Sequence, residues 1–158
     1  MRKINYIVVH CSATREGCTL TSEALEAEHR RRGFRTTGYH YYIRRDGTVL
    51  GTRSLELPGA HCRGHNKYSI GICYEGGLDA RGNPKDTRTP EQRSALHLLV
   101  YQLLQQFRNA RVCGHRDLSP DLDGDGTVEP WEWVKQCPCF EVRSEEHTSE
   151  LQSHLMIS

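Results

Sequence analysis

The segment from Thr89 to Phe107 constrains the fold most, because its apolar residues recur at helical spacing. Thr89 can cap its start, Pro90 stands in the first turn, and Gln92 can complete a capping box. The apolar residues of one face are Leu96, Leu99, Val100, Leu103, Leu104 and Phe107. A helix with one such face must bury it against a second layer, so the rest of the chain has to supply that layer.

Short runs of β-branched and aromatic residues predict that this layer is a sheet. They are residues 4–10, 38–53, 68–77 and 110–115. The second run is expected to be a hairpin, because Asp46-Gly47 tolerates the positive φ of a tight turn. A second helix is expected at residues 21–34, where Thr21 or Ser22 can cap its start. The pattern predicts an α/β fold: one domain with a mixed central β-sheet packed by helices.

Length and charge narrow the class of protein. A chain of 158 residues is long enough for one domain with a core, and its net charge of +1 implies no partner nucleic acid. No apolar run approaches the roughly 20 residues of a membrane helix, so no membrane insertion is expected. The apolar part of the N-terminus, Ile7 to Val9, is too short for a signal peptide. We therefore expect a monomer that is made in the cytoplasm and leaves it by a route that does not use a signal peptide.

The seven cysteines do not suggest a disulfide framework. Their number is odd, and no signal peptide precedes them. Most are expected to be small buried apolar residues or free thiols. A minority are expected to be metal ligands.

The last sixteen residues, 143–158, differ in character from the rest. The segment is polar, and its few apolar residues show no sustained period. It resembles, residue for residue through His154, the translation of a common sequencing adapter read in frame. We therefore expect the domain to be residues 1–142, and we do not count His147 or His154 as ligands.

Two histidines and a cysteine stand where side chains can converge on a cleft. His10 ends the first predicted strand, His115 ends the last one, and Cys137 lies downstream before Pro138. Two imidazoles and one thiolate satisfy three of the four positions of tetrahedral zinc and leave one for water. Each histidine taken singly is equally compatible with a surface or core role.

A set of segments carries a family resemblance. They are IVVHCSAT, GYHYYIRRDGTV, GAHCRGHNKYSIGICYEGG, TPEQ, GHRDLSP and KQCPCFEV, in that order. The chain resembles, from Ile4 to Val142, the zinc-dependent N-acetylmuramoyl-L-alanine amidases of the phage-lysozyme type, which are related to peptidoglycan recognition proteins. The resemblance implies that fold and a zinc ion held by His10, His115 and Cys137. The family's ligand is the cysteine before proline, which favours Cys137 over Cys139.

The resemblance also implies two catalytic residues, Tyr39 and Lys135. A fixed ammonium or phenol can stabilise the oxyanion that forms during amide hydrolysis, and Tyr39 can instead pass a proton to the leaving amine. His61 matches a family histidine beside the metal cleft. We expect it either to contact substrate or to hold a metal ligand in place, and we expect Asn66 to contact substrate.

The sequence also gives an expectation for the role of His40 and one for the packing of the helix at Glu28 and His29. His40 follows Tyr39 in a strand, so it must point to the other face of the sheet. Glu28 and His29 stand where relatives often carry a Trp–His pair. The helix is therefore expected to pack less tightly there.

The insert 119–134 carries a second set of metal ligands, all of them oxygen. Its sequence DLDGDGTVEPWE fits the twelve-position EF-hand loop, with Gly126 at the sharp turn. The expected ligands are Asp121, Asp123, Asp125, Thr127, Glu129 and Glu132. Oxygen ligands at this spacing suit calcium rather than zinc, because closely spaced carboxylates repel each other without a cation. The alternative is an acidic solvated loop.

The predicted function is hydrolysis of the amide between N-acetylmuramic acid and L-alanine in peptidoglycan, for cell-wall lysis or turnover. The sequence is compatible with a phage lysis enzyme that reaches the wall through a holin and with a bacterial recycling or prophage-derived enzyme, and the missing signal peptide favours a phage or prophage origin. One alternative is a recognition module that binds peptidoglycan without cutting it. Another is a cytosolic thiol or calcium protein, which would leave His10 and His115 without a role.

Overall fold

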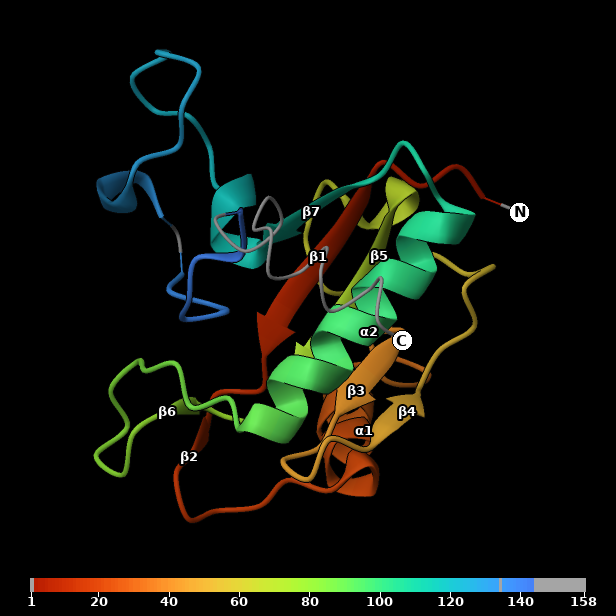
Figure 1. Ribbon diagram of the computed structural model, residues 1–158, viewed down its shortest axis with the longest axis vertical. Helices are drawn as coiled ribbons and strands as arrows, with labels where there is room; N and C mark the ends of the chain where they lie inside the picture. The colour runs from red at the N-terminus through yellow and green to blue at the C-terminus, as the bar shows by residue number, and fades with distance from the viewer. Residues whose placement is uncertain (1, 134, 144–158) are drawn as a thin grey trace.

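The computed structural model describes residues 2–133 and 135–143, and these residues form a mixed five-stranded sheet (Figure 1). The strands, in spatial order, are β4 (Val49–Gly51), β3 (Tyr41–Ile43), β5 (Ser69–Tyr74), β1 (Tyr6–Cys11) and β7 (Arg111–Gly114). All neighbours pair in parallel except β3 and β4, which form the hairpin predicted around Asp46-Gly47. The predicted α/β class and mixed sheet are confirmed.

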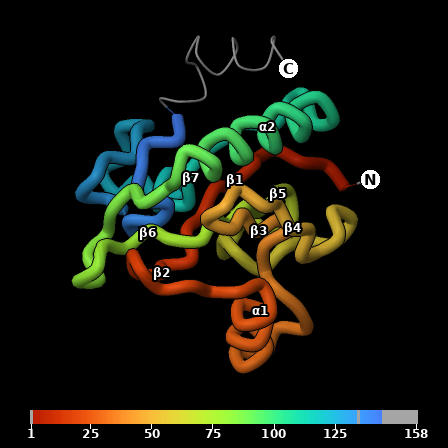
Figure 2. The backbone as a smooth tube through the Cα atoms, turned by 60° about the horizontal axis from the view of Figure 1, so that its bottom comes forward, coloured from red at the N-terminus to blue at the C-terminus, as the bar shows by residue number. Residues whose placement is uncertain are grey.

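Two helices lie on opposite faces of this sheet (Figure 2). They are α1 (Ser22–Arg31) and α2 (Pro90–Gln106), and both begin at the predicted caps. The Thr21 hydroxyl accepts from the Ala24 amide, and Thr89 and Gln92 form the complete capping box. Short 3₁₀ helices follow at η1 (Asn66–Tyr68), η2 (His115–Leu118) and η3 (Pro130–Glu132).

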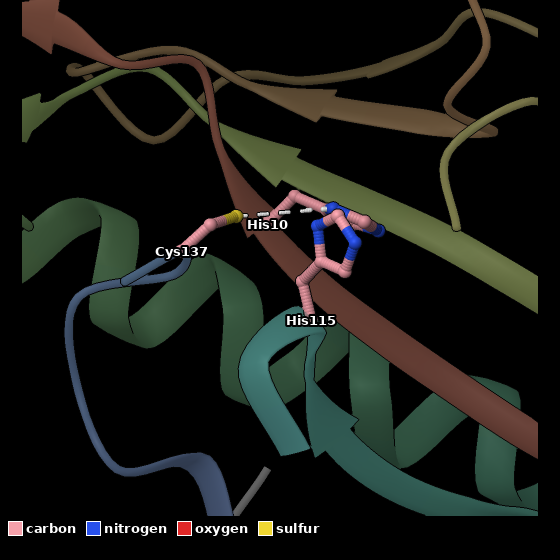
Figure 3. Close-up of side chains that lie close together, drawn as sticks. All are labelled: His10, His115 and Cys137. Atoms are coloured by element: carbon pink, nitrogen blue, oxygen red, sulfur yellow. Dashed lines mark hydrogen bonds between the residues drawn. The ribbon is translucent and has the colours of Figure 1, made fainter. Parts of the chain in front are cut away.

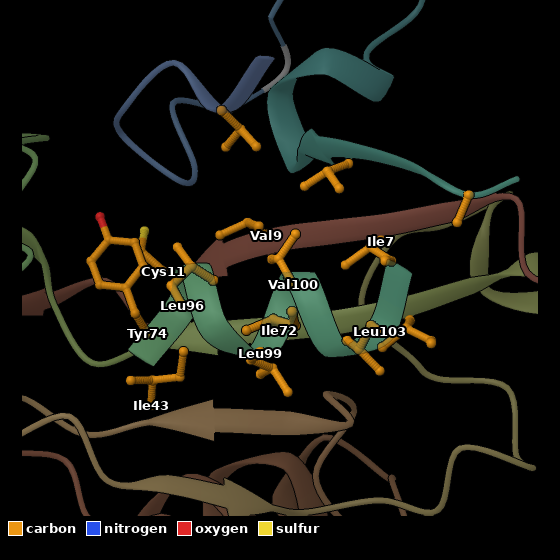
Figure 4. Close-up of a cluster of buried hydrophobic side chains, with 14 of the residues drawn as sticks. Ile7, Val9, Cys11, Ile43, Ile72, Tyr74, Leu96, Leu99, Val100 and Leu103 are labelled. Atoms are coloured by element: carbon orange, nitrogen blue, oxygen red, sulfur yellow. The ribbon is translucent and has the colours of Figure 1, made fainter. Parts of the chain in front are cut away.

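The larger apolar core lies between α2 and one face of the sheet (Figure 4). Side chains alternate along β1, so Ile7, Val9 and Cys11 join this core. His10 therefore points to the opposite face, the side of α1. A smaller core there contains Leu25, Tyr42 and Cys73.

Several features were not predicted or lie outside the description. β2 (Thr14–Arg15) and β6 (Gly77–Leu78) form a separate parallel pair, and strands of two residues are too short to show a period. The predicted adapter segment lies outside the described residues except for Arg143, as does Val134 of the predicted insert. Within the described ranges, no helix is both long and apolar enough to cross a bilayer.

Candidate metal centre

The candidate centre lies at the carboxyl ends of β1 and β7. These strands are parallel neighbours, so His10 near the end of β1 and His115 directly after β7 meet at the same edge of the sheet. The His115 backbone begins the 3₁₀ turn η2, which the Asp117 carboxylate stabilises by accepting from the Gly114 amide at 2.8 Å. Strand pairing therefore brings together two histidines 105 positions apart in the sequence.

Cys137 reaches the same edge on the loop that follows the insert. The Arg116 amide donates to the Cys137 carbonyl oxygen at 2.9 Å, and the Cys11 amide donates to its sulfur at 3.2 Å. Pro138 packs directly against Gly114, where a Cβ atom would lie 2.6 Å from the proline ring. The glycine lets the loop approach closely enough for Cys137 to face the histidines.

The three predicted ligands converge (Figure 3). One ligand atom from each of His10, His115 and Cys137 lies within 4.8 Å of the others. The Cys137 Sγ is 3.8 Å from His10 Nδ1, and the two imidazole ring centres are 4.7 Å apart. Two nitrogens and one sulfur at this separation fit a zinc ion with one open position.

The electrostatics of His10 suit a ligand. The residue is 1% exposed, and burial lowers its pKa well below the usual value, with His61, His115 and Lys135 adding to the effect. The imidazole is therefore neutral at neutral pH, and one ring nitrogen carries a lone pair available to a metal.

Tyr39 and Lys135 lie beside this triad. The Tyr39 ring is 5.1 Å from that of His10, centre to centre. Burial raises the pKa of the Tyr39 phenol well above its usual value, and the thiols of Cys73 and Cys137 act in the same direction. The phenol thus keeps its proton at neutral pH and can donate it in a hydrogen bond. Lys135 is exposed and lines both hollows described below.

Two hollows meet at His115 and Lys135. A small one of about 210 Å³ contains the triad and Tyr39 and reaches α1. A larger cleft of about 1040 Å³ runs along β7 and η2 and is bordered by Arg63 and Arg111. A substrate with its scissile bond at the triad could occupy both hollows.

His61 lies beside His10 and lines the small hollow. It is 9% exposed, and its Nδ1 is 2.8 Å from His10 Nε2. Burial, helped by the nearby His40 and His115, lowers the pKa of His61 to about 3. The Asn66 side-chain oxygen accepts from the amides of His61 and Cys62, both at 2.9 Å. This oxygen therefore holds the backbone at His61 and Cys62 in place. The expected contact of Asn66 with substrate stays a prediction.

His40 is fully buried and has a structural role, as expected. Its Nδ1 accepts from the Gly71 amide and its Nε2 is bonded to the Leu57 carbonyl, so both ring nitrogens are engaged. Alternation of side chains along a strand does not explain the orientation of His40, because β3 begins only at Tyr41 and His40 lies before it. Its ring centre is 6.0 Å from that of His61.

The expected loose packing at His29 is wrong. His29 is 4% exposed, its Nδ1 accepts from the Gly38 amide at 2.8 Å, and its ring lies 5.4 Å from that of Tyr39. The imidazole fills the space beside Tyr39, and Glu28 remains exposed.

The acidic insert projects from the body beside the large cleft (Figure 1). Four predicted ligands, Asp121, Asp123, Asp125 and Glu132, offer oxygens within 4.8 Å of one another. The carboxylate of Glu129 instead accepts from the Trp131 indole at 2.9 Å, and the Thr127 amide donates to Asp125 at 2.9 Å. The structure therefore gathers four of the five predicted carboxylate ligands, and the carbonyl oxygen expected from Thr127 stays a prediction.

The carboxylates of this insert disturb one another. The Asp125 amide lowers the pKa of Asp123, but desolvation and hydrogen bonds with the carboxyl groups of Asp121 and Asp125 raise it on balance to about 6. Glu132 is 2% exposed and accepts from the backbone amides of Leu122 and Glu129. It ties the start of the loop to its end.

Sequence reasoning missed the environment of His61. Its ring lies against Gly59 and Gly71, where an added Cβ would come within 2.5 and 2.6 Å of the imidazole, and its Nε2 is 3.2 Å from the Ser69 hydroxyl. The glycine of Ser-Ile-Gly in β5 was the available signal, because glycine inside a strand indicates a close approach by another group.

Comparison with known proteins identifies relatives of this fold and site. Residues 1–138 match the family described as N-acetylmuramoyl-L-alanine amidase. The endolysin of Klebsiella phage KP32 is 35% identical over 142 residues, which cover 90% of this chain and 85% of the relative. The solved amidase LysC from Clostridium intestinale has a TM-score of 0.72 and 25% identity, over 99% of this chain and 88% of its own. Drosophila PGRP-LB in complex with tracheal cytotoxin shares the fold, with a TM-score of 0.68 and 18% identity over 94% and 83% of the two chains.

Proposed function

The chain belongs to the N-acetylmuramoyl-L-alanine amidase family, and on that premise we propose that His10, His115 and Cys137 hold the zinc ion that this hydrolysis requires. The enzyme cleaves the amide bond between N-acetylmuramic acid and L-alanine of peptidoglycan. The observation that carries the zinc proposal is the convergence of three suitable ligand atoms within 4.8 Å. A bound zinc ion would supply Lewis acidity, which activates water and polarises the amide carbonyl.

The surrounding side chains supply the other elements of amide hydrolysis. Tyr39 keeps its proton and its ring lies against that of His10, so its hydroxyl can donate a hydrogen bond to the oxygen of the scissile carbonyl as negative charge develops there. Lys135 stands at the junction of the two hollows and provides positive charge at the same point. Tyr39 can also deliver its proton to the leaving amine.

The large cleft is proposed to receive the stem peptide. Free carboxylates on a muropeptide belong to its peptide, whereas the lactyl carboxyl of the sugar is already consumed in the scissile amide. Arg63 and Arg111 border the large cleft, and their charges favour those carboxylates. The small hollow, which reaches Glu28 and Arg32 near the end of α1, is left for the sugar side.

The cellular setting follows from the substrate. The phage relatives are endolysins, so we propose that this chain acts on the cell wall after release through a holin. All three metal ligands come from one chain, which is consistent with a monomer. A non-catalytic recognition module is the alternative, but a pure binder would not need the zinc ligands, Tyr39 and Lys135 together.

Mass analysis of products from defined muropeptides tests the proposed zinc site. The zinc-loaded enzyme should release the intact stem peptide with a free L-alanine amine, chelation should stop this, and added zinc should restore it. Cys137→Ser should abolish the product, whereas Cys139→Ser, two positions away and outside the triad, should keep it. Equal activity in the two variants would contradict the ligand assignment.

We also propose that the insert binds calcium. Four converging carboxylates, one of them buried, and the raised pKa of Asp123 support a cation site here. Calcium would hold the loop that leads to Lys135 and Cys137. Calorimetric titration of calcium into zinc-loaded protein should give heat and raise the thermal midpoint, and Asp121→Asn with Asp123→Asn should remove both effects. No heat in the unaltered protein would reject the calcium site and leave the zinc site untouched.

A further inference from the structure

His61 and Ser69 form a chain of hydrogen bonds behind the candidate zinc ligand His10. His10 Nε2 is 2.8 Å from His61 Nδ1, and His61 Nε2 is 3.2 Å from Ser69 Oγ. The rings of the two histidines are nearly perpendicular, at 84°. All three residues are buried, which protects these contacts from exchange with bulk water.

The geometry of His10 fixes the direction of these hydrogen bonds once a metal is present. His10 Nδ1 faces Cys137 at 3.8 Å, so Nδ1 is the nitrogen available to the metal. A neutral imidazole has one N–H, so a metal on Nδ1 requires the proton on Nε2. His10 Nε2–H must then donate to His61, and His61 must accept through Nδ1 and carry its own proton on Nε2.

The surroundings of His61 leave its ring little freedom. The ring lies against Gly59 and Gly71, and a side chain at either glycine would overlap it. Its backbone amide is held by Asn66 at 2.9 Å. Ser69, at the start of β5, offers a hydroxyl oxygen to the Nε2 side of the ring. The site is therefore built to hold one ring in one place.

We propose that His61 is a positioning residue for the metal: it accepts the Nε2 proton of His10, donates its own Nε2 proton to Ser69, and so keeps His10 Nδ1 free and aimed at zinc. This inference rests on the proposed zinc site. A ligating histidine usually donates its second N–H to a carboxylate or a backbone carbonyl. Here the acceptor is the neutral imidazole of His61, which in turn donates to the Ser69 hydroxyl. In this role His61 acts through His10.

Two substitutions of similar shape separate a hydrogen-bond role from a packing role. In His61→Asn, the side-chain oxygen of the new amide can lie near the position of Nδ1, whereas His61→Leu has a similar shape without an acceptor. Zinc affinity, measured by competition with a chromophoric chelator, should fall about 10- to 100-fold in His61→Leu and stay within about fivefold of wild type in His61→Asn. Equal losses in both variants, or none in His61→Leu, would overturn the proposal.

Nitrogen NMR of the unaltered zinc-loaded protein gives a test that does not depend on variants folding. His10 should show a proton on Nε2 with Nδ1 bound to metal, and His61 should show a proton on Nε2 and a bare Nδ1. A proton on His61 Nδ1 would refute the inference even if zinc binds. Absence of zinc binding in the wild-type protein would instead reject the zinc site itself, so the two failures are distinguishable.

Discussion

The backbone amide of Cys11 donates a hydrogen bond to the sulfur of Cys137 at 3.2 Å, joining the end of the first strand to a loop 126 residues later. The same contact fixes Cys137 beside His10, the residue before Cys11. The candidate metal centre therefore depends on this contact between β1 and the Cys137 loop as well as on its two histidines.

Removing the hydroxyl of Tyr39 tests its place in catalysis. Tyr39→Phe keeps the ring that packs against His10 and His29 but removes the donor. We expect kcat on a defined muropeptide to fall about 10²- to 10³-fold, with KM nearly unchanged. Tyr41→Phe is the matched control, because Tyr41 packs on the α2 side of the sheet. A Tyr39→Phe enzyme as fast as the control would remove Tyr39 from the mechanism.

Reversing charge in the large cleft tests where the stem peptide lies. Arg111 is exposed on β7, so Arg111→Glu should leave the fold intact while repelling peptide carboxylates. We expect KM to rise about tenfold at low salt, less at high salt, with kcat little changed. Arg35→Glu, outside both hollows, serves as the control. If a substrate lacking free carboxylates shows the same rise in KM, the assignment of the cleft to the peptide is wrong.

A methyl group at Gly71 should disturb the candidate metal centre through the ring of His61. Its Cβ would lie 2.6 to 2.9 Å from three atoms of the His61 ring, inside a packed layer. We expect Gly71→Ala to cost about 1–3 kcal/mol of the free energy of unfolding and to weaken zinc binding. Denaturant unfolding of the metal-free protein measures the first effect, and chelator competition the second. Gly51→Ala, where no atom lies within 4 Å, is the control.

The buried His40 should make stability depend on pH in the acid range. Burial lowers its pKa from 6.5 to about 4, against the opposing effect of the Leu57 carbonyl. The unfolded chain binds a proton below pH 6.5 that the folded chain does not bind until near pH 4. The contribution of neutral His40 is therefore complete above pH 6.5 and is lost as pH falls towards 4, with a slope of up to about 1.4 kcal/mol per pH unit.

Urea unfolding of metal-free protein at several pH values measures this slope. His40→Asn keeps an acceptor for the Gly71 amide but cannot titrate in this range. The free energy of unfolding of His40→Asn should fall less steeply as pH is lowered than that of the wild type. The difference between the two slopes should correspond to the uptake of about one proton on unfolding. Parallel curves for the two proteins would show that His40 is not the group responsible.

Features with local signals were predictable from the sequence. The caps Thr21 and Thr89, the apolar face of α2 and the Asp46-Gly47 turn lie within a few residues of the elements they define. His10 and His115 could be placed near each other because both stand at the ends of strands. The pairing of His10 with His61 could not, because it depends on β1 and β5 being neighbours and on the space left by Gly59 and Gly71. His29 was misjudged because its amide partner, Gly38, belongs to a different segment.

X-ray absorption at the zinc edge tests the central claim most directly, because it reports which atoms surround the metal. Zinc-loaded protein should show one sulfur at about 2.3 Å and two imidazole nitrogens at about 2.0–2.1 Å, with a light atom completing the shell. The sulfur should disappear in Cys137→Ser and persist in Cys139→Ser. A shell without sulfur, or a sulfur that survives Cys137→Ser, would contradict the account.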